Sequence, residues 1–197
     1  MSPARVRIGY VVAAAIVLLG VTYPLFGDSV VRSLVPDTSG CPGAREVPTP
    51  STEKSTRRAT LCLLNRRRAE HGLRSLASSR VLARAARAHS RDMASRRYFA
   101  HDAPDGRTPA RRIAAAGYPR EGVTVGENLA WGDDSAAAPA EIVAGWMESP
   151  GHRANVLRPE YTEIGIGLAH AAPRRVTGRA AIYTTGFGHP PAVRTAR

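Results

Sequence analysis

The sequence predicts an α+β domain, a sandwich in which a small antiparallel sheet lies between helices, preceded by an N-terminal transmembrane or signal helix. Four segments with apolar residues at helical spacing lie between residues 57 and 149, and two β-like segments follow them. A long uncharged run opens the chain. Helices followed along the chain by paired strands are typical of the α+β class.

Residues 1–27 predict the compartment. Arg5 and Arg7 precede 19 uncharged residues, 8–26, which at about 1.5 Å per residue are long enough for a helix to cross the hydrocarbon core of a membrane. Positive charges before such a helix predict a cytoplasmic N-terminus and an exported domain that stays anchored in the cell membrane. The alternative is a cleaved signal peptide and a secreted domain, although "TYPLFGDS" offers no clear small-x-small cleavage site.

Residues 28–56 are predicted to be a linker, because four prolines stand there among Ser, Thr, Gly and charged residues. Cys41 lies in this stretch and Cys62 in the first predicted helix. In an oxidising compartment the two can form a disulfide that joins the linker to the helix, and two free thiols are the alternative. The chain has no CxxC or Cys/His pattern, which excludes a zinc finger.

Helices make up the first part of the domain, which is predicted to span residues 57–188. The helical pattern is clearest after the candidate N-cap Ser79, where an apolar stripe includes His89 and ends at Met93. Gly72 stands where the first helix should end, and Pro109 occupies a permitted first-turn position of the third. The predicted helices cover residues 57–72, 78–99, 108–118 and 139–149.

Strands are predicted late in the domain. Residues 162–171 and 179–188 are two β-like runs joined by "APRRVTG", a pattern that predicts a hairpin. Residues 123–132 are either a third strand or an extended loop. Residues 189–197, "HPPAVRTAR", are predicted to be a disordered tail.

Basic residues give the chain a formal net charge of +12. Lys54 is the one lysine among 28 basic residues, so 27 are arginines. They are scattered through every segment and form no stripe interleaved with aromatic residues, which argues against a nucleic-acid partner. Attraction to anionic lipid or to an acidic cell-wall polymer fits an exported basic protein better.

Three short motifs carry ionisable residues at the ends of predicted elements. They are "YFAHDAPDG" with His101, "GENLAWG" with Glu127 and "GHRANVL" with His152. Two imidazoles and a carboxylate are the ligand set of a catalytic-type zinc site and are also a proton-transfer group. The alternative is that the histidines are loop or cap residues and that Glu127 braces a loop by accepting backbone hydrogen bonds.

Six motifs in a fixed order resemble the CAP superfamily of cysteine-rich secretory, antigen 5 and pathogenesis-related 1 proteins, and most closely the bacterial SCP-like extracellular proteins. They are "LNRRRAEHGLRSL", "AARAHSRDMASRRYFAHDAPDG", "AAAGY", "GENLAWG", "WMESPGHRANVL" and "EIGIGLA". The resemblance runs from about residue 60 to residue 188. It implies an α-β-α sandwich with a large cleft.

The resemblance also implies that His101, His152 and Glu127 line this cleft, with His101 and His152 as the ligands of a divalent cation such as zinc. Eukaryotic members carry a second glutamate, where this chain has Ser149, and Glu148 is one residue too early. A difference of one residue turns a side chain by about 100° around a helix. A three-residue site is therefore expected instead of a four-residue one.

The function that follows is a non-enzymatic, membrane-tethered extracellular module that binds a ligand in the His/His/Glu cleft. The resemblance implies a small hydrophobic or lipid ligand, or a component of the cell surface or cell wall. The first alternative is a metal-dependent hydrolase of peptide or cell-wall material, in which Glu127 activates a zinc-bound water. The second alternative is a structural cell-wall attachment protein held by its basic charge.

Overall fold

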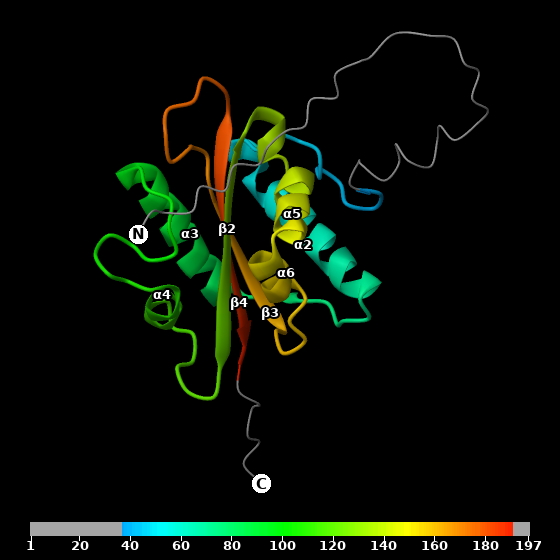
Figure 1. Cartoon of the computed structure of the whole chain (residues 1–197), viewed down its shortest axis with the longest axis vertical. Coiled ribbons are helices and arrows are strands. Elements are labelled where there is room, and N and C mark those ends of the chain that lie inside the picture. Colours follow the sequence, from blue (N-terminus) through cyan, green and yellow to red (C-terminus); the bar gives the residue numbers. More distant parts are fainter. Residues whose placement is uncertain (1–36, 191–197) are drawn as a thin grey trace, which may run out of the picture. The chain divides into compact units, whose positions relative to one another are not determined.

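The computed structural model describes residues 37–190, which are built around one four-stranded sheet (Figure 1). The strand order is β1-β3-β4-β2, and β2 and β3 each pair antiparallel with β4. The strands are β1 (Ala77–Ser78), β2 (Thr124–Asp133), β3 (Glu163–Ala169) and β4 (Ala180–His189).

The three antiparallel strands confirm the predicted pattern, and residues 124–133 form a strand and not an extended loop. The sheet as a whole is mixed, because β1 pairs parallel with β3 at Glu163 and Ile164. The predicted antiparallel sheet is therefore right for β2, β3 and β4 and wrong for β1. A two-residue strand is too short to show an alternating pattern, so no local signal marks β1.

Helices cover both faces of the sheet, as the predicted sandwich requires. Figure 1 shows α3 and α4 on one side of the strands and α2, α5 and α6 on the other. The helices are α2 (Glu53–Glu70), α3 (Arg80–Arg96), α4 (Pro109–Ala115), α5 (Pro139–Glu148) and α6 (Pro150–Val156), with short 3-10 helices η1 (Pro50–Thr52) and η2 (Asp134–Ala137).

Helix α3 lies directly against the backbone of β3. A Cβ atom added to Gly165 would lie 2.0 Å from the backbone nitrogen of Ala83, and one added to Gly167 would lie 2.2 Å from that of Arg87. No side chain fits in this contact. The alternate residues of β3, Ile164 and Ile166, belong to the core cluster that also contains the buried side chains of α2 and α5.

The folded region begins earlier than residue 57. Cys41 and Ala44 are buried in the core, and the Ala140 N–H donates to the Ala44 carbonyl at 2.8 Å. The disulfide between Cys41 and Cys62 is present, as predicted, and ties this segment to α2. Part of the stretch that its composition assigns to a linker therefore packs on the domain.

Within residues 37–190, no helix is long and apolar enough to cross a membrane. The transmembrane or signal helix predicted at 1–27 lies outside the described residues. The same is true of positions 28–36 of the predicted linker and of 191–197 in the predicted tail.

A buried arginine joins α2 to the segment that follows α6. Arg68 is fully buried. Its guanidinium donates four hydrogen bonds of 2.8 to 3.1 Å, all to backbone carbonyls. The acceptors are the carbonyl oxygens of Arg74, Val156, Arg158 and Tyr161. Arg68 therefore fixes the end of α6, the helix that carries His152.

Candidate functional site

The carboxylate of Glu127 is held between two basic groups. Glu127 lies in β2, and its side chain is only 5% exposed. One oxygen, Oε1, lies 2.9 Å from Nδ1 of His101, and the other, Oε2, accepts a 2.8 Å bond from Arg112. Two of these three groups were candidate site residues from the sequence. The carboxylate accepts bonds from side chains here, and does not brace a loop through backbone N–H groups.

Arg112 is the member of the group that sequence reasoning missed. It lies in α4, its side chain is 6% exposed, and it also donates to the carbonyl of Arg107 at 2.7 Å. Helix α4 begins after the Thr108 N-cap, whose hydroxyl accepts from the Arg111 N–H. The one sequence feature that could have indicated its burial is that Arg112 precedes Ile113 on the buried side of a short helix. The chain has 27 arginines, and nothing in the sequence distinguishes Arg112 from the others.

His101 lies in the loop between α3 and α4, and its side chain is 51% exposed. A buried carboxylate therefore orients a solvent-accessible imidazole. Because Nδ1 faces Glu127, the second ring nitrogen, Nε2, is the one available to an external group. This arrangement resembles that of metal-binding histidines, which commonly donate their other ring N–H to a carboxylate.

His152 lies in α6, which Figure 1 shows on the opposite side of the strands from α3 and α4. It is the third residue of α6, after the extended Ser149 that separates this helix from α5. Two asparagines attach α6 to the outer edge of β2: Asn128 donates to the His152 carbonyl at 3.0 Å, and Asn155 donates to the Glu127 carbonyl at 3.1 Å. Gly126 allows this close packing, because a Cβ there would lie 2.3 Å from the Tyr161 hydroxyl.

The two histidines are near enough to interact electrostatically. Burial lowers the pKa of the half-buried His152 imidazole, and the positive charge of His101 lowers it further. Desolvation and a like charge both disfavour the imidazolium form. His152 is therefore held in the neutral form to a lower pH than an ordinary histidine.

His89 is a packing histidine, as its place on the α3 stripe predicts. It is 1% exposed, and its Nε2 donates to the Ala100 carbonyl at 3.0 Å. Burial lowers the pKa of His89, although the negative charge of Glu127 opposes that shift. His89 therefore supports the loop that leads from α3 to His101.

The side chains that could hold a metal ion here are the two imidazoles. A neutral His152 and the free nitrogen of His101 are suitable zinc donors. Within residues 37–190, no three His, Cys, Asp or Glu side chains are grouped closely enough to hold a metal ion. Glu148, which replaces the expected second glutamate one position early, is exposed. Any metal here would need water or a ligand to complete its coordination.

The loop that carries His101 also carries an exposed aromatic residue. Phe99 is 41% exposed, and it is the one large hydrophobic side chain with that exposure in the described part of the chain. It lies two residues before His101, in the same loop.

Comparisons with known proteins agree with the fold. The model of the cysteine-rich secretory protein family, CAP, matches residues 61–185. The chain is similar to a solved extracellular protein with an SCP domain from Bacillus anthracis str. Ames, at 27% identity and a TM-score of 0.55, over 72% of this chain and 45% of that one. It also has the fold of a solved outer surface protein from Borrelia burgdorferi, at 20% identity and a TM-score of 0.59, over 71% and 95% of the two chains.

Two proteins of Bacillus subtilis (strain 168) are similar in sequence. YkwD is 36% identical over 122 residues, which are 62% of this chain and 46% of YkwD. YlbC, which is named as a membrane protein, is 30% identical over 116 residues, or 59% of this chain and 32% of YlbC. The matched region thus spans less than half the length of either relative.

Proposed function

The chain belongs to the CAP family of cysteine-rich secretory proteins, and from this premise we propose that it is an exported module that binds a ligand at His101 and His152 without catalysing a reaction. The observation that carries this proposal is the ordered row Arg112–Glu127–His101, which presents an exposed imidazole beside a neutral second one. We further propose that the apolar run at 8–26 tethers the domain to the membrane.

A divalent cation such as zinc is the cofactor that suits these groups. His101 would bind it through Nε2, and His152 would bind it as a neutral imidazole. Bound zinc supplies an open coordination position that attracts a polar or anionic group of a ligand. Glu127 keeps the His101 ring in place through Nδ1, and Phe99 offers a contact to an apolar part of the same ligand.

Ligand binding is favoured over hydrolysis because both carboxylate oxygens of Glu127 already have partners. A hydrolase would need this carboxylate to accept a proton from an attacking water. Both of its oxygens are instead engaged, one by His101 and one by Arg112. Within residues 37–190, neither His101 nor His152 makes a side-chain hydrogen bond with a serine, threonine or cysteine that could act as a nucleophile.

Calorimetric titration of the full chain with zinc tests the proposal. We expect one zinc ion to bind at about pH 7.5 and to bind much more weakly at about pH 5, because a protonated imidazole cannot act as a ligand. Replacing His101 or His152 with alanine should abolish binding. His189→Ala is the matched control, because His189 is exposed at the end of β4 and lies outside the site.

Zinc binding that survives in both His101→Ala and His152→Ala would contradict the proposal, and so would equal affinity at the two pH values. If only the His189→Ala variant lost zinc binding, the metal site would lie at His189 and not at His101 and His152. A Glu127→Gln variant separates orientation from ligation. It should weaken zinc binding without abolishing it, since the glutamine can still hold the His101 ring.

A further inference from the structure

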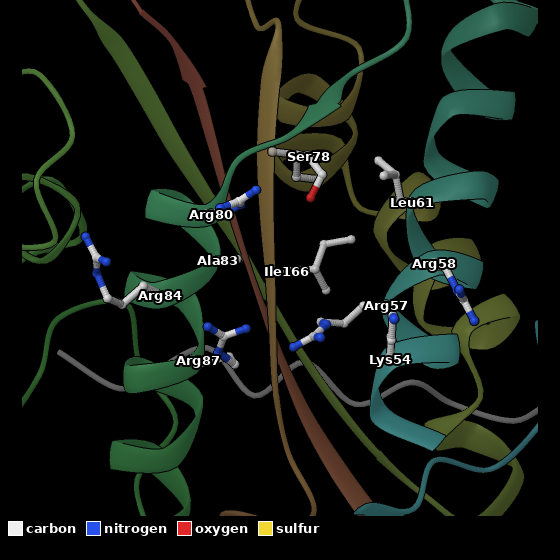
Figure 2. Close-up of a pocket in the computed structure, with 11 residues that line it drawn as sticks. Lys54, Arg57, Arg58, Leu61, Ser78, Arg80, Ala83, Arg84, Arg87 and Ile166 are labelled. Atoms are coloured by element: carbon white, nitrogen blue, oxygen red, sulfur yellow. The ribbon is translucent and has the colours of Figure 1, made fainter. Parts of the chain in front are cut away.

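A groove of about 550 Å³ lies between α2 and α3, over β3, and none of His101, Glu127 and His152 lines it (Figure 2). Basic side chains dominate its lining, and no lining residue carries a carboxylate. The basic residues are Lys54, Arg57, Arg58, Arg80, Arg84 and Arg87.

Four of these cations have no partner in the described part of the chain. Arg57 binds Glu53 at 2.8 Å, and Arg84 donates to the Ala116 carbonyl. Within residues 37–190, the other four basic side chains of the groove make no ion pair and no hydrogen bond. Their positive charges are therefore free to act on a bound anion.

Figure 2 shows how the side chains are directed. Arg57 from α2 and Arg87 from α3 turn toward one another across the groove, and Ile166 lies between them. Arg84 turns away, toward the carbonyl that it binds. The groove thus has a cationic wall on each helix and an apolar floor.

The cations recur along each wall. Lys54 and Arg57 are one helical turn apart on α2, and Arg80 and Arg87 are two turns apart on α3, where one turn advances about 5 Å. Arg80 is also the first residue of α3, whose first turn contains no acidic residue. A cation is unfavourable at a helix N-terminus, so helix stability does not account for Arg80 in this position.

From these features we infer that the groove binds a linear polyanion that carries a phosphate group on each repeating unit. Rows of cations match a chain of anions better than they match one isolated anion. The partly exposed Leu61 on α2 and the edge of Ile166 on the floor can contact the uncharged part of each unit. No aromatic side chain lines the groove, so nothing there stacks on nucleic-acid bases. The partner is accordingly a polyanion without bases, and we take its anionic groups to be phosphates, which arginine and lysine side chains commonly bind.

Titration of the full chain, kept in mild detergent, with linear inorganic polyphosphate of medium length tests this inference. The test variant replaces Lys54, Arg80 and Arg87 with glutamine, which removes three unpaired charges and leaves the Arg57–Glu53 pair intact. We expect its affinity to fall roughly tenfold to a hundredfold, and the slope of log affinity against log salt to become shallower by about 2. Orthophosphate should bind the unmodified chain far more weakly than polyphosphate.

The matched control replaces three exposed arginines outside the groove, Arg111, Arg120 and Arg175, with glutamine. It has the same net charge as the test variant and should keep its affinity within about twofold. Equal losses in the two variants would overturn the inference, because binding would then follow net charge alone. The absence of polyphosphate binding, or equally tight binding of single-stranded oligothymidylate at the same residues, would overturn it too.

Two further variants remove ambiguity from this experiment. Circular dichroism establishes whether the triple variant is folded, and the double variant Lys54→Gln, Arg87→Gln replaces it if it is not. Polyphosphate affinity should be unchanged in His101→Ala, because His101 does not line the groove. The zinc proposal and the polyanion inference can therefore fail independently.

Discussion

Replacing Arg68 with methionine should destabilise the protein strongly. The guanidinium of this fully buried residue supplies hydrogen bonds to four backbone carbonyls that lie in two different segments of the chain. Methionine keeps most of the apolar stem and removes every donor. The carbonyls would then be buried without partners.

The size of the effect follows from two opposing contributions. Each buried carbonyl that loses its donor costs about 1 to 2 kcal/mol. Removal of a buried charge offsets several kcal/mol of this cost, because the charge no longer has to be taken out of water. The free energy of unfolding should fall by about 3 kcal/mol, and the melting temperature should fall by roughly 10 °C for a folded region of this size.

Urea denaturation and thermal melting, both followed by circular dichroism, measure this change. Arg67→Met is the control, because Arg67 pairs with Glu70 at the surface, and loss of such a pair costs about 0.5 kcal/mol. The two variants remove the same charge from adjacent positions of α2. If Arg68→Met lost less than about 1 kcal/mol, or no more than Arg67→Met, the four hydrogen bonds would not hold α2 to the end of α6.

Two other predictions concern stability. Replacing both Cys41 and Cys62 with serine should lower the free energy of unfolding by about 3 kcal/mol, because the bridge closes a loop across 21 positions; an unchanged urea midpoint would contradict this. Burial lowers the pKa of His89, so below about pH 6.5 the unfolded chain binds a proton that the folded chain does not, and stability falls as the pH decreases. Urea midpoints measured at about pH 7 and about pH 5 should therefore differ less in His89→Leu than in the unmodified protein, and an equal difference would argue against this role.

The elements that the sequence predicted well are those in which many residues repeat one pattern. In α3, the residues from Leu82 to Met93 that recur at helical spacing are the ones that are buried. Strand β3 was found because small and branched residues alternate along it, and β4 because it is an uncharged run rich in β-branched and aromatic residues after a turn signal. The spacing of apolar residues indicates which residues are buried, because the face of a helix or strand that packs against the core must be apolar.

Short elements and long-range contacts were not predictable in this way. The start of α2 was missed because the Ser, Thr and Pro residues before it are typical of a linker, although Thr49 and Thr52 form a capping box at η1, which leads directly into α2. Burial of Ala44 depends on its contact with α5, which comes much later in the chain, and no local pattern reports such a contact.

The sequence singled out the ionisable residues that lie in recognisable motifs and missed the buried arginines. His101, Glu127 and His152 stand out as ionisable residues beside glycines. Arg112 and Arg68 do not, because an arginine in a helix is ordinarily taken to face solvent. The structure buries both, and each is satisfied by partners from other elements. Only the three-dimensional arrangement reveals those partners.

The brevity of β1 has a consequence for self-association. Beyond Ile164, the outer edge of β3 has no neighbouring strand in the described part of the chain. Open sheet edges invite pairing with another molecule and hence aggregation. Here the cationic rows of α2 and α3 flank that edge, so two copies approaching edge to edge bring like charges together. The basic side chains that would attract a polyanion therefore also oppose edge-to-edge pairing of two copies of this protein. A bound polyanion would neutralise these charges, and neighbouring copies could then pack closely along the polymer.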